Sequence, residues 1–174
     1  MINTFNTAVG LGTIGVLLIT LSIWLLIFLQ ETNNHYFRFL KKHSFHFGFL
    51  LSLGAILGSL VYSEIFHLVP CTFCWWQRIF MYPQAIVLAT GIYLKDLKIW
   101  ITAIVLSAIG ACFSIYHILI QSGVVGPSGA CQTSTVSCAK IDFVALGWIT
   151  MPIMCLSLFI GILSFSYISH RKQA

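Results

Sequence analysis

Five long apolar stretches, separated by short segments that hold most of the charged residues, constrain the fold of this chain more than any other feature. The stretches span residues 8–29, 45–69, 71–94, 99–121 and 143–168. A helix needs about 20 apolar residues to cross the hydrocarbon core of a bilayer, so each stretch predicts one membrane-spanning helix. Composition agrees, because 59% of the 174 residues are hydrophobic and only 7% are charged. We therefore expect an all-α membrane protein, and a soluble or disordered chain is excluded.

The basic residues predict how these helices are oriented. Seven of the nine fall in segments on one side of the predicted membrane: Arg38, Lys41, Lys42, Lys95, Lys98, Arg171 and Lys172. Cytoplasmic loops carry such an excess, so we expect the N-terminus outside and the C-terminus in the cytoplasm. The first stretch is expected to stay as a helix rather than act as a signal peptide, because no basic segment precedes it and its apolar run is too long. Nine scattered basic residues do not form the basic stripe of a nucleic-acid-binding protein.

Four of the six cysteines lie in the two predicted external loops, at residues 69–74 and 122–142. They are Cys71, Cys74, Cys131 and Cys138. Because the outer side of a bacterial plasma membrane permits disulfides, these four residues are either two structural disulfides or two redox pairs. The other two, Cys112 and Cys155, fall inside apolar helices, where a cysteine ordinarily packs as a small hydrophobic residue.

A zinc site is a further interpretation of the loop cysteines. It would use the four thiolates, joined by His67 or His117. The six residues between Cys131 and Cys138 are a looser spacing than zinc sites usually have, so we expect no metal.

The sequence Cys71-Thr-Phe-Cys74 is a C-x-x-C motif at the expected start of a helix. The positive end of the helix dipole favours a thiolate there. Arg78 follows Cys74 by four residues, which places both on one helix face. An arginine at the membrane boundary is costly unless it is paired or used, so a thiolate or the oxygen of a bound polar headgroup is its expected partner.

Residues around this motif have simpler interpretations. We expect an interfacial belt and packing, rather than cofactor stacking, from Trp75, Trp76, Met81 and Tyr82. Glu64 and His67, three apart on one expected helix face, are interpreted as a boundary ion pair or as side chains that snorkel to the interface, rather than as a proton relay. Small residues in the second stretch predict close helix packing, namely Gly48, Gly54, Ala55, Gly58 and Ser59.

The segment 62–83, YSEIFHLVPCTFCWWQRIFMYP, resembles the DsbB/BdbC family of membrane disulfide bond formation proteins. The resemblance extends over about residues 45–168 and includes the second cysteine pair before the last helix. It implies a four-helix transmembrane bundle at residues 45–170, with residues 1–44 as an extra N-terminal helix and a basic cytoplasmic loop. The short spacing of Cys131 and Cys138 is closer to the BdbC branch than to the long-loop DsbB branch.

The resemblance also implies a reaction, in which a soluble DsbA-like thioredoxin-fold thiol oxidase is re-oxidised on the outer side of a bacterial plasma membrane. Cys131 matches the cysteine that the partner's thiolate attacks, and Cys138 matches its mate, which exchanges with Cys71. The electrons then pass to a membrane quinone, either ubiquinone or menaquinone. Cys74 matches the thiol beside the quinone ring, while Arg78 and His117 match residues linked to quinone binding.

Two other functions remain open at this point. A vitamin K epoxide reductase is also a four-helix bundle with two cysteine pairs, but its loop pair precedes its C-x-x-C, whereas Cys71 and Cys74 come first here. A non-catalytic metal-binding or transport protein usually has ionisable residues at mid-membrane. Glu64 and Arg78 instead lie near the outer boundary of the predicted membrane.

Overall fold

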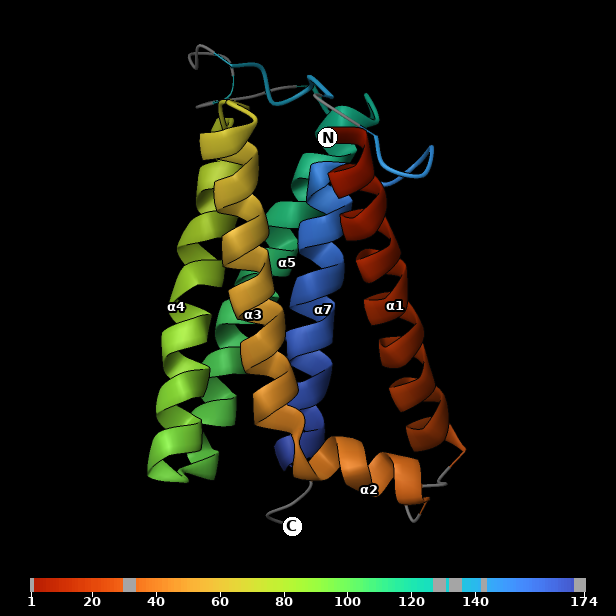
Figure 1. Ribbon diagram of the computed structural model, residues 1–174, viewed down its shortest axis with the longest axis vertical. Helices are drawn as coiled ribbons and strands as arrows, with labels where there is room; N and C mark the ends of the chain where they lie inside the picture. The colour runs from red at the N-terminus through yellow and green to blue at the C-terminus, as the bar shows by residue number, and fades with distance from the viewer. Residues whose placement is uncertain (1, 30–33, 127–130, 132–135, 142–143, 171–174) are drawn as a thin grey trace.

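A computed structural model describes residues 2–29, 34–126, 131, 136–141 and 144–170 of the chain (Figure 1). Its main elements are α1 (Ile2–Phe28), α2 (His35–Lys42), α3 (Ser44–Leu60), the π-helical turn η1 (Val61–Ile65), α4 (Thr72–Leu94), the 3-10 turn η2 (Leu97–Ile99), α5 (Trp100–Gln121) and α7 (Met151–His170). Four helices are long and apolar enough to cross a membrane, namely α1, α3 with η1, α5 and α7. The remaining long helix, α4, has 23 residues but is more polar because it carries Gln77, Arg78 and Gln84. The predicted all-α membrane architecture is confirmed.

Helices α3, α4, α5 and α7 pack in a ring, each against two neighbours, and α1 packs against α7 outside this ring (Figure 1). The bundle core includes Phe45 of α3, Leu88 of α4 and Phe159 of α7. Phe159 lies against Gly110 of α5, where any side chain would overlap its ring. The small residue therefore allows α5 and α7 to approach closely.

Helix α1 is fixed to the bundle at both ends. Near its start, the Tyr62 hydroxyl donates a hydrogen bond of 2.8 Å to Asn6 Oδ1, and both residues are buried. Near its end, Trp24 Nε1 donates to Ser164 Oγ at 3.0 Å. Because a buried polar group costs free energy unless it is hydrogen-bonded, these two contacts favour one position of α1 on the bundle.

Part of the predicted basic loop is a short helix, α2, which the apolar stretches alone did not indicate. The side chain of Asn34 accepts a hydrogen bond from the Tyr36 N–H and so caps the helix. Phe37 and Leu40, three residues apart, are buried against the bundle, whereas Arg38 is exposed. This is the pattern of an amphipathic helix that lies in a membrane interface.

Three predicted helix limits were wrong. The first helix begins at Ile2 rather than at residue 8. The helix that begins at Ser44 ends at Ile65 rather than at residue 69, and His67 lies beyond it with a φ of 53°. Glu64 and His67 therefore do not share a helix face, and both side chains are exposed. The last helix begins at Met151 rather than at residue 143, which itself lies outside the described residues. A tight turn, closed by a bridge between Ala145 and Ile149, occupies part of the expected helix.

The α3–α4 junction, the start of α1 and the α5–α7 connection lie at one end of the molecule, and α2 and the α4–α5 turn lie at the other (Figure 1). The described part of the chain thus has the two predicted cysteine loops at the same end. Residues 127–130 and 132–135 of the second predicted loop, and the basic residues Arg171 and Lys172, lie outside the described residues.

Candidate active site

Cys71 is the N-cap residue of α4. Its φ and ψ of −70° and 172° are extended, and its sulfur accepts a hydrogen bond of 3.4 Å from the Cys74 N–H. The sulfurs of Cys71 and Cys74 are 3.0 Å apart. A small displacement would therefore join them in a disulfide, and the helix N-terminus favours negative charge on Cys71 when they are separate.

Cys131 and Cys138 form a disulfide, and both are buried. They pack with Cys71 and Ile120 in one small apolar cluster at the end of the bundle. The structure thus brings together the two cysteine pairs that the sequence placed in separate loops.

His117 of α5 lies between the two pairs. Its Nε2 atom is 3.1 Å from the carbonyl oxygen of Cys138 and 3.7 Å from the sulfur of Cys71. A carbonyl oxygen only accepts hydrogen bonds, so we assign the hydrogen to Nε2, and the sulfur of Cys71 is then a second acceptor of the same N–H. The ring is 1% exposed, which keeps this contact away from water. His117 therefore joins the C-x-x-C pair to the disulfide loop.

These contacts lower the pKa of the Cys71 thiol below its ordinary value. The hydrogen bond from Cys74 has the largest effect, and the hydrogen bond and charge of His117 act in the same direction. Burial of the sulfur opposes them without cancelling them. In the reduced pair, these contacts favour Cys71 over Cys74 as the thiolate.

We expect the alkylation of Cys71 in the reduced protein to persist to lower pH than that of an ordinary thiol, because only the thiolate reacts. Replacing His117 by alanine removes a group that lowers this pKa, so the profile of rate against pH should move to higher pH. The measurement is the modified fraction of the Cys71 peptide by mass spectrometry over time. His35→Ala, an exposed histidine of α2 at the far end of the molecule, is the matched control. If the pH profiles of His117→Ala and the unmodified protein coincide, His117 does not lower the pKa of Cys71.

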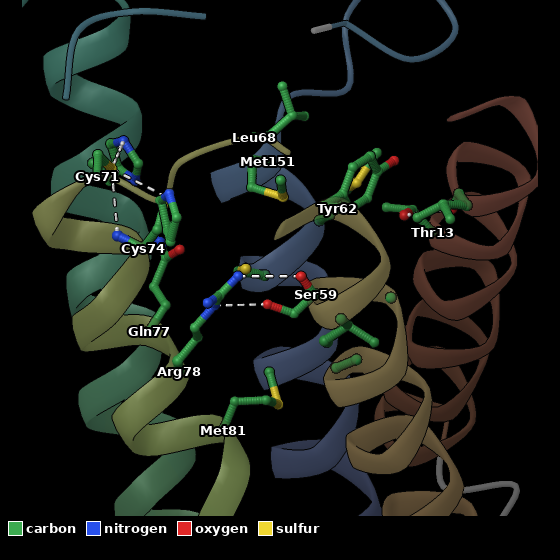
Figure 2. A pocket seen from close by; sticks show the side chains of 18 of the residues that line it. Thr13, Ser59, Tyr62, Leu68, Cys71, Cys74, Gln77, Arg78, Met81 and Met151 are labelled. Atoms are coloured by element: carbon green, nitrogen blue, oxygen red, sulfur yellow. Dashed lines mark hydrogen bonds between the residues drawn. The ribbon is translucent and has the colours of Figure 1, made fainter. Parts of the chain in front are cut away.

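A cavity of about 300 Å³ lies beside the C-x-x-C pair, between α1, α3, α4 and α7 (Figure 2). Cys74 and Arg78 both line it, as expected for residues four apart on one helix face. Arg78 Nε donates to Ser59 Oγ at 2.8 Å, and another guanidinium nitrogen donates to the Ser59 carbonyl oxygen at 3.1 Å. Its guanidinium carbon also lies 5.2 Å from the Trp75 ring centre. These described partners are neutral, so the positive charge remains available to an anion in the cavity.

Gln77 is a cavity residue that the sequence analysis did not single out. It is 2% exposed, and neither of its amide atoms has a hydrogen-bond partner among the described residues. A buried amide without a partner costs free energy, so a ligand with a polar oxygen would fit here. The signal was present in the sequence, because Gln77 directly precedes Arg78 in a helix expected to be apolar.

The remaining predictions for nearby residues have mixed outcomes. Gly48 packs closely, since an added Cβ would lie 3.2 Å from Leu88, but Gly54 and Gly58 have open space and line the cavity instead. Cys155, expected to pack as a small hydrophobe, is half-buried and also lines the cavity, and Cys112 is exposed on the outside of α5 rather than packed inside.

The four residues expected to form an interfacial belt and packing fall into two groups. Met81 and Tyr82 line the cavity, while Trp75 and Trp76 are exposed on the outer face of α4 as an interfacial belt would be.

The donor atoms of Cys71, Cys74 and His117 lie within 4.8 Å of one another, which is close enough for a metal ion. This set differs from the one considered from the sequence, because Cys131 and Cys138 are joined to each other. Two thiolates and an imidazole suit zinc, so metal content distinguishes a metal site from a redox pair.

A helical bundle with membrane-spanning helices and two cysteine pairs at one end defines the class of membrane proteins that exchange disulfides. Comparison with known proteins agrees. Residues 41–169 match the family model described as disulfide bond formation protein DsbB. Among curated proteins, the chain is 44% identical over 117 residues to the SPbeta prophage-derived disulfide bond formation protein B of Bacillus subtilis, covering 66% of this chain and 78% of that protein.

More distant relatives bear similar names. The chain is 38% identical over 122 residues to probable disulfide formation protein C 1 of Bacillus anthracis, covering 70% of this chain and 88% of that protein. It is 37% identical over 120 residues to a probable disulfide formation protein of Coxiella burnetii, covering 68% of this chain and 81% of that protein. No solved structure matches the chain. The chain belongs to the DsbB family of disulfide bond formation proteins, and it is a membrane thiol–disulfide oxidoreductase.

Proposed function

We propose that this protein oxidises the dithiol of a soluble thioredoxin-fold partner, DsbA-like in chemistry, on the outer side of a bacterial plasma membrane, and passes the electron pair to a membrane quinone. The contact that supports this most strongly is His117 Nε2, which lies between Cys71 of one cysteine pair and Cys138 of the other. Two pairs that share a contact and a common apolar cluster are suited to exchange electrons in series.

The first exchange takes place at the loop disulfide. A partner thiolate attacks the Cys131 sulfur, the bond to Cys138 breaks, and Cys138 leaves as a thiolate. The partner's second thiolate then attacks its own mixed-disulfide sulfur and releases Cys131. The partner leaves with a disulfide, and Cys131 and Cys138 hold the two electrons as a dithiol.

The second exchange moves these electrons to the C-x-x-C pair. The Cys138 thiolate attacks Cys71 in the oxidised pair, and Cys74 leaves as a thiolate facing the cavity. Cys131 then attacks Cys138 and releases Cys71, which restores the loop disulfide. His117 donates a hydrogen bond to the sulfur of Cys71 and so stabilises it as the leaving thiolate.

The cavity fits a quinone ring. Arg78 offers a positive charge, Gln77 a buried amide without a described partner, and the remaining lining is mainly apolar. A bound quinone supplies an acceptor for two electrons and two protons. Arg78 would stabilise both the Cys74 thiolate and negative charge on a ring oxygen, and Gln77 would donate to the ring through its Nε2.

We expect Arg78→Ala to raise the KM for quinone roughly ten- to hundredfold, because a charged hydrogen bond contributes about 1.5–3 kcal/mol. The partner-dependent reduction of the Cys131–Cys138 disulfide should be unchanged, because that disulfide lies outside the cavity lining. Steady-state kinetics with varied quinone measure the first quantity, and a single addition of reduced partner without quinone measures the second. Arg38→Ala, at the opposite end in α2, is the matched control. An unchanged KM for quinone in Arg78→Ala would remove this role.

A further inference from the structure

The first helix, α1, lines the same cavity as the cysteine pair, although it lies outside the residues that match the DsbB family model. Val9, Gly12, Thr13 and Val16 of α1 form part of the wall. Figure 2 shows Thr13 on α1, across the cavity from Gln77 on α4. Helix α1 therefore contributes to the candidate site, although it lies outside residues 41–169, which match the family model.

The part of the cavity next to α1 is a long apolar groove. A second, smaller cavity of about 160 Å³ shares Val16, Leu50 and Leu51 with the first and continues past Ile19 between α1 and α3. The α1 residues from Val9 to Ile19 span roughly 15 Å at the helical rise. The polar groups that would hold a ring, Arg78 and Gln77, are found only in the larger cavity beside the cysteines. The shape and chemistry are those of a site for a polar ring with a long apolar tail.

Glycines on both walls keep this groove open. A Cβ added at Gly12 of α1, or at Gly54 or Gly58 of α3, would meet no described atom within 4 Å. Elsewhere the same helices make close contact through a glycine, because a Cβ at Gly161 of α7 would lie 3.0 Å from Val16 and 3.1 Å from Leu51. The helices α1 and α3 thus both rest on α7 and leave the groove between them.

We propose that α1 is the outer wall of a channel for the isoprenoid tail of the quinone, so that it determines how much more tightly a long-tailed quinone binds than a short-tailed one. The proposal rests on the proposed function, since it takes the ring to lie beside Cys74 and Arg78. The smaller cavity shares Val16, Leu50 and Leu51 with the larger one, and this continuity with the ring site favours the tail of the same quinone as its occupant. The hydrogen bonds that fix α1, from Tyr62 to Asn6 and from Trp24 to Ser164, hold this wall in position.

The test is the dissociation constant of the full-length protein for two quinones with the same ring, one with a single isoprene unit and one with a long isoprenoid tail. Bound quinone is quantified by extraction after equilibrium in detergent. Gly12→Leu places a side chain in the groove, and it should weaken the long-tailed quinone about tenfold and leave the short-tailed one unchanged. Gly15→Leu is the matched control, because Gly15 also has open space around it but lines neither cavity. Leucine is a better helix former than glycine, so neither variant should weaken α1 itself.

Equal weakening of both quinones by Gly12→Leu, or no change in either, would overturn the role of α1. The groove would then hold a lipid chain or nothing that affects the quinone. Failure of the proposed function would be seen differently, because the unmodified protein would bind neither quinone and would form no quinol from reduced partner. A different result is that the unmodified protein reduces quinone while Gly12→Leu leaves the ratio of the two dissociation constants, long-tailed to short-tailed, unchanged. That result contradicts only the inference on α1.

Discussion

Replacing Cys138 by alanine should trap the partner on the protein. The partner's thiolate can form a disulfide with Cys131 only if that residue is oxidised, so the variant is first treated with a small disulfide such as oxidised glutathione. The trap uses a partner whose second cysteine is replaced by serine, because that thiol would otherwise release Cys131. This partner displaces glutathione from Cys131, and without Cys138 no thiol in the loop releases it. With the unaltered partner, turnover should fall to below roughly 1% of that of the unmodified protein, as for loss of other catalytic nucleophiles. The adduct is measured on non-reducing gels and confirmed by mass spectrometry of the linked peptides.

Cys112→Ala is the matched control for this trap, because Cys112 is exposed on the outside of α5 and lines neither cavity. It should retain full turnover and give no adduct. If Cys138→Ala turns over normally, or if the linked peptide contains Cys71 instead of Cys131, the order of the relay is wrong.

Replacing Cys74 by serine should abolish quinone reduction while sparing the first exchange with the partner. The Cys71–Cys74 disulfide cannot form in this variant, so only the Cys131–Cys138 disulfide accepts electrons. Without quinone, one molecule of the variant should oxidise one equivalent of reduced partner, where the fully oxidised parent oxidises two. With excess quinone, the parent should continue and the variant should stop, with turnover below roughly 1%.

Titration of partner thiols in acid-quenched samples gives both stoichiometries. Cys155→Ser is the control, since Cys155 lines the same cavity as Cys74 but takes no part in the proposed disulfide exchange. It should behave like the parent in both measurements. Sustained turnover in Cys74→Ser would contradict the assignment of Cys74 as the thiol that faces the quinone.

The long helices and the cysteines were predictable from the sequence because both leave local signals. An uninterrupted apolar stretch is visible without knowledge of its neighbours, and a C-x-x-C motif at a helix start is defined by four residues. The predicted position of Arg78 on the face of Cys74 also depended only on helical spacing, and both residues line the cavity.

Features that depend on packing were not predictable in the same way. Gly48 and Gly54 look alike in the sequence, yet one lies against Leu88 and the other faces open space. The contribution of α1 to the cavity depends on how it rests on Gly161, far along the chain. Helix α2 was missed because it is eight residues long and only two of them, Phe37 and Leu40, are buried.

Local backbone geometry explains the remaining differences. The helix after Ser44 ends in a π-helical turn at Val61–Ile65, and His67 then adopts a positive φ of 53°. A residue other than glycine rarely adopts that conformation, so helical spacing gave the wrong relation between His67 and Glu64. The π-helical turn also carries Tyr62, whose side chain lines the cavity and holds Asn6 of α1. Such turns are frequent at functional sites.

The central claim is that two electrons travel from a partner dithiol through both cysteine pairs to a quinone. The most direct test mixes the purified full-length protein, a reduced thioredoxin-fold partner and a quinone, and measures quinol and partner disulfide together over time. One quinol for each partner disulfide is the predicted result, with no requirement for metal. Partner oxidation without quinol, or a stoichiometric metal ion bound by Cys71, Cys74 and His117 with no quinol formed, would contradict it.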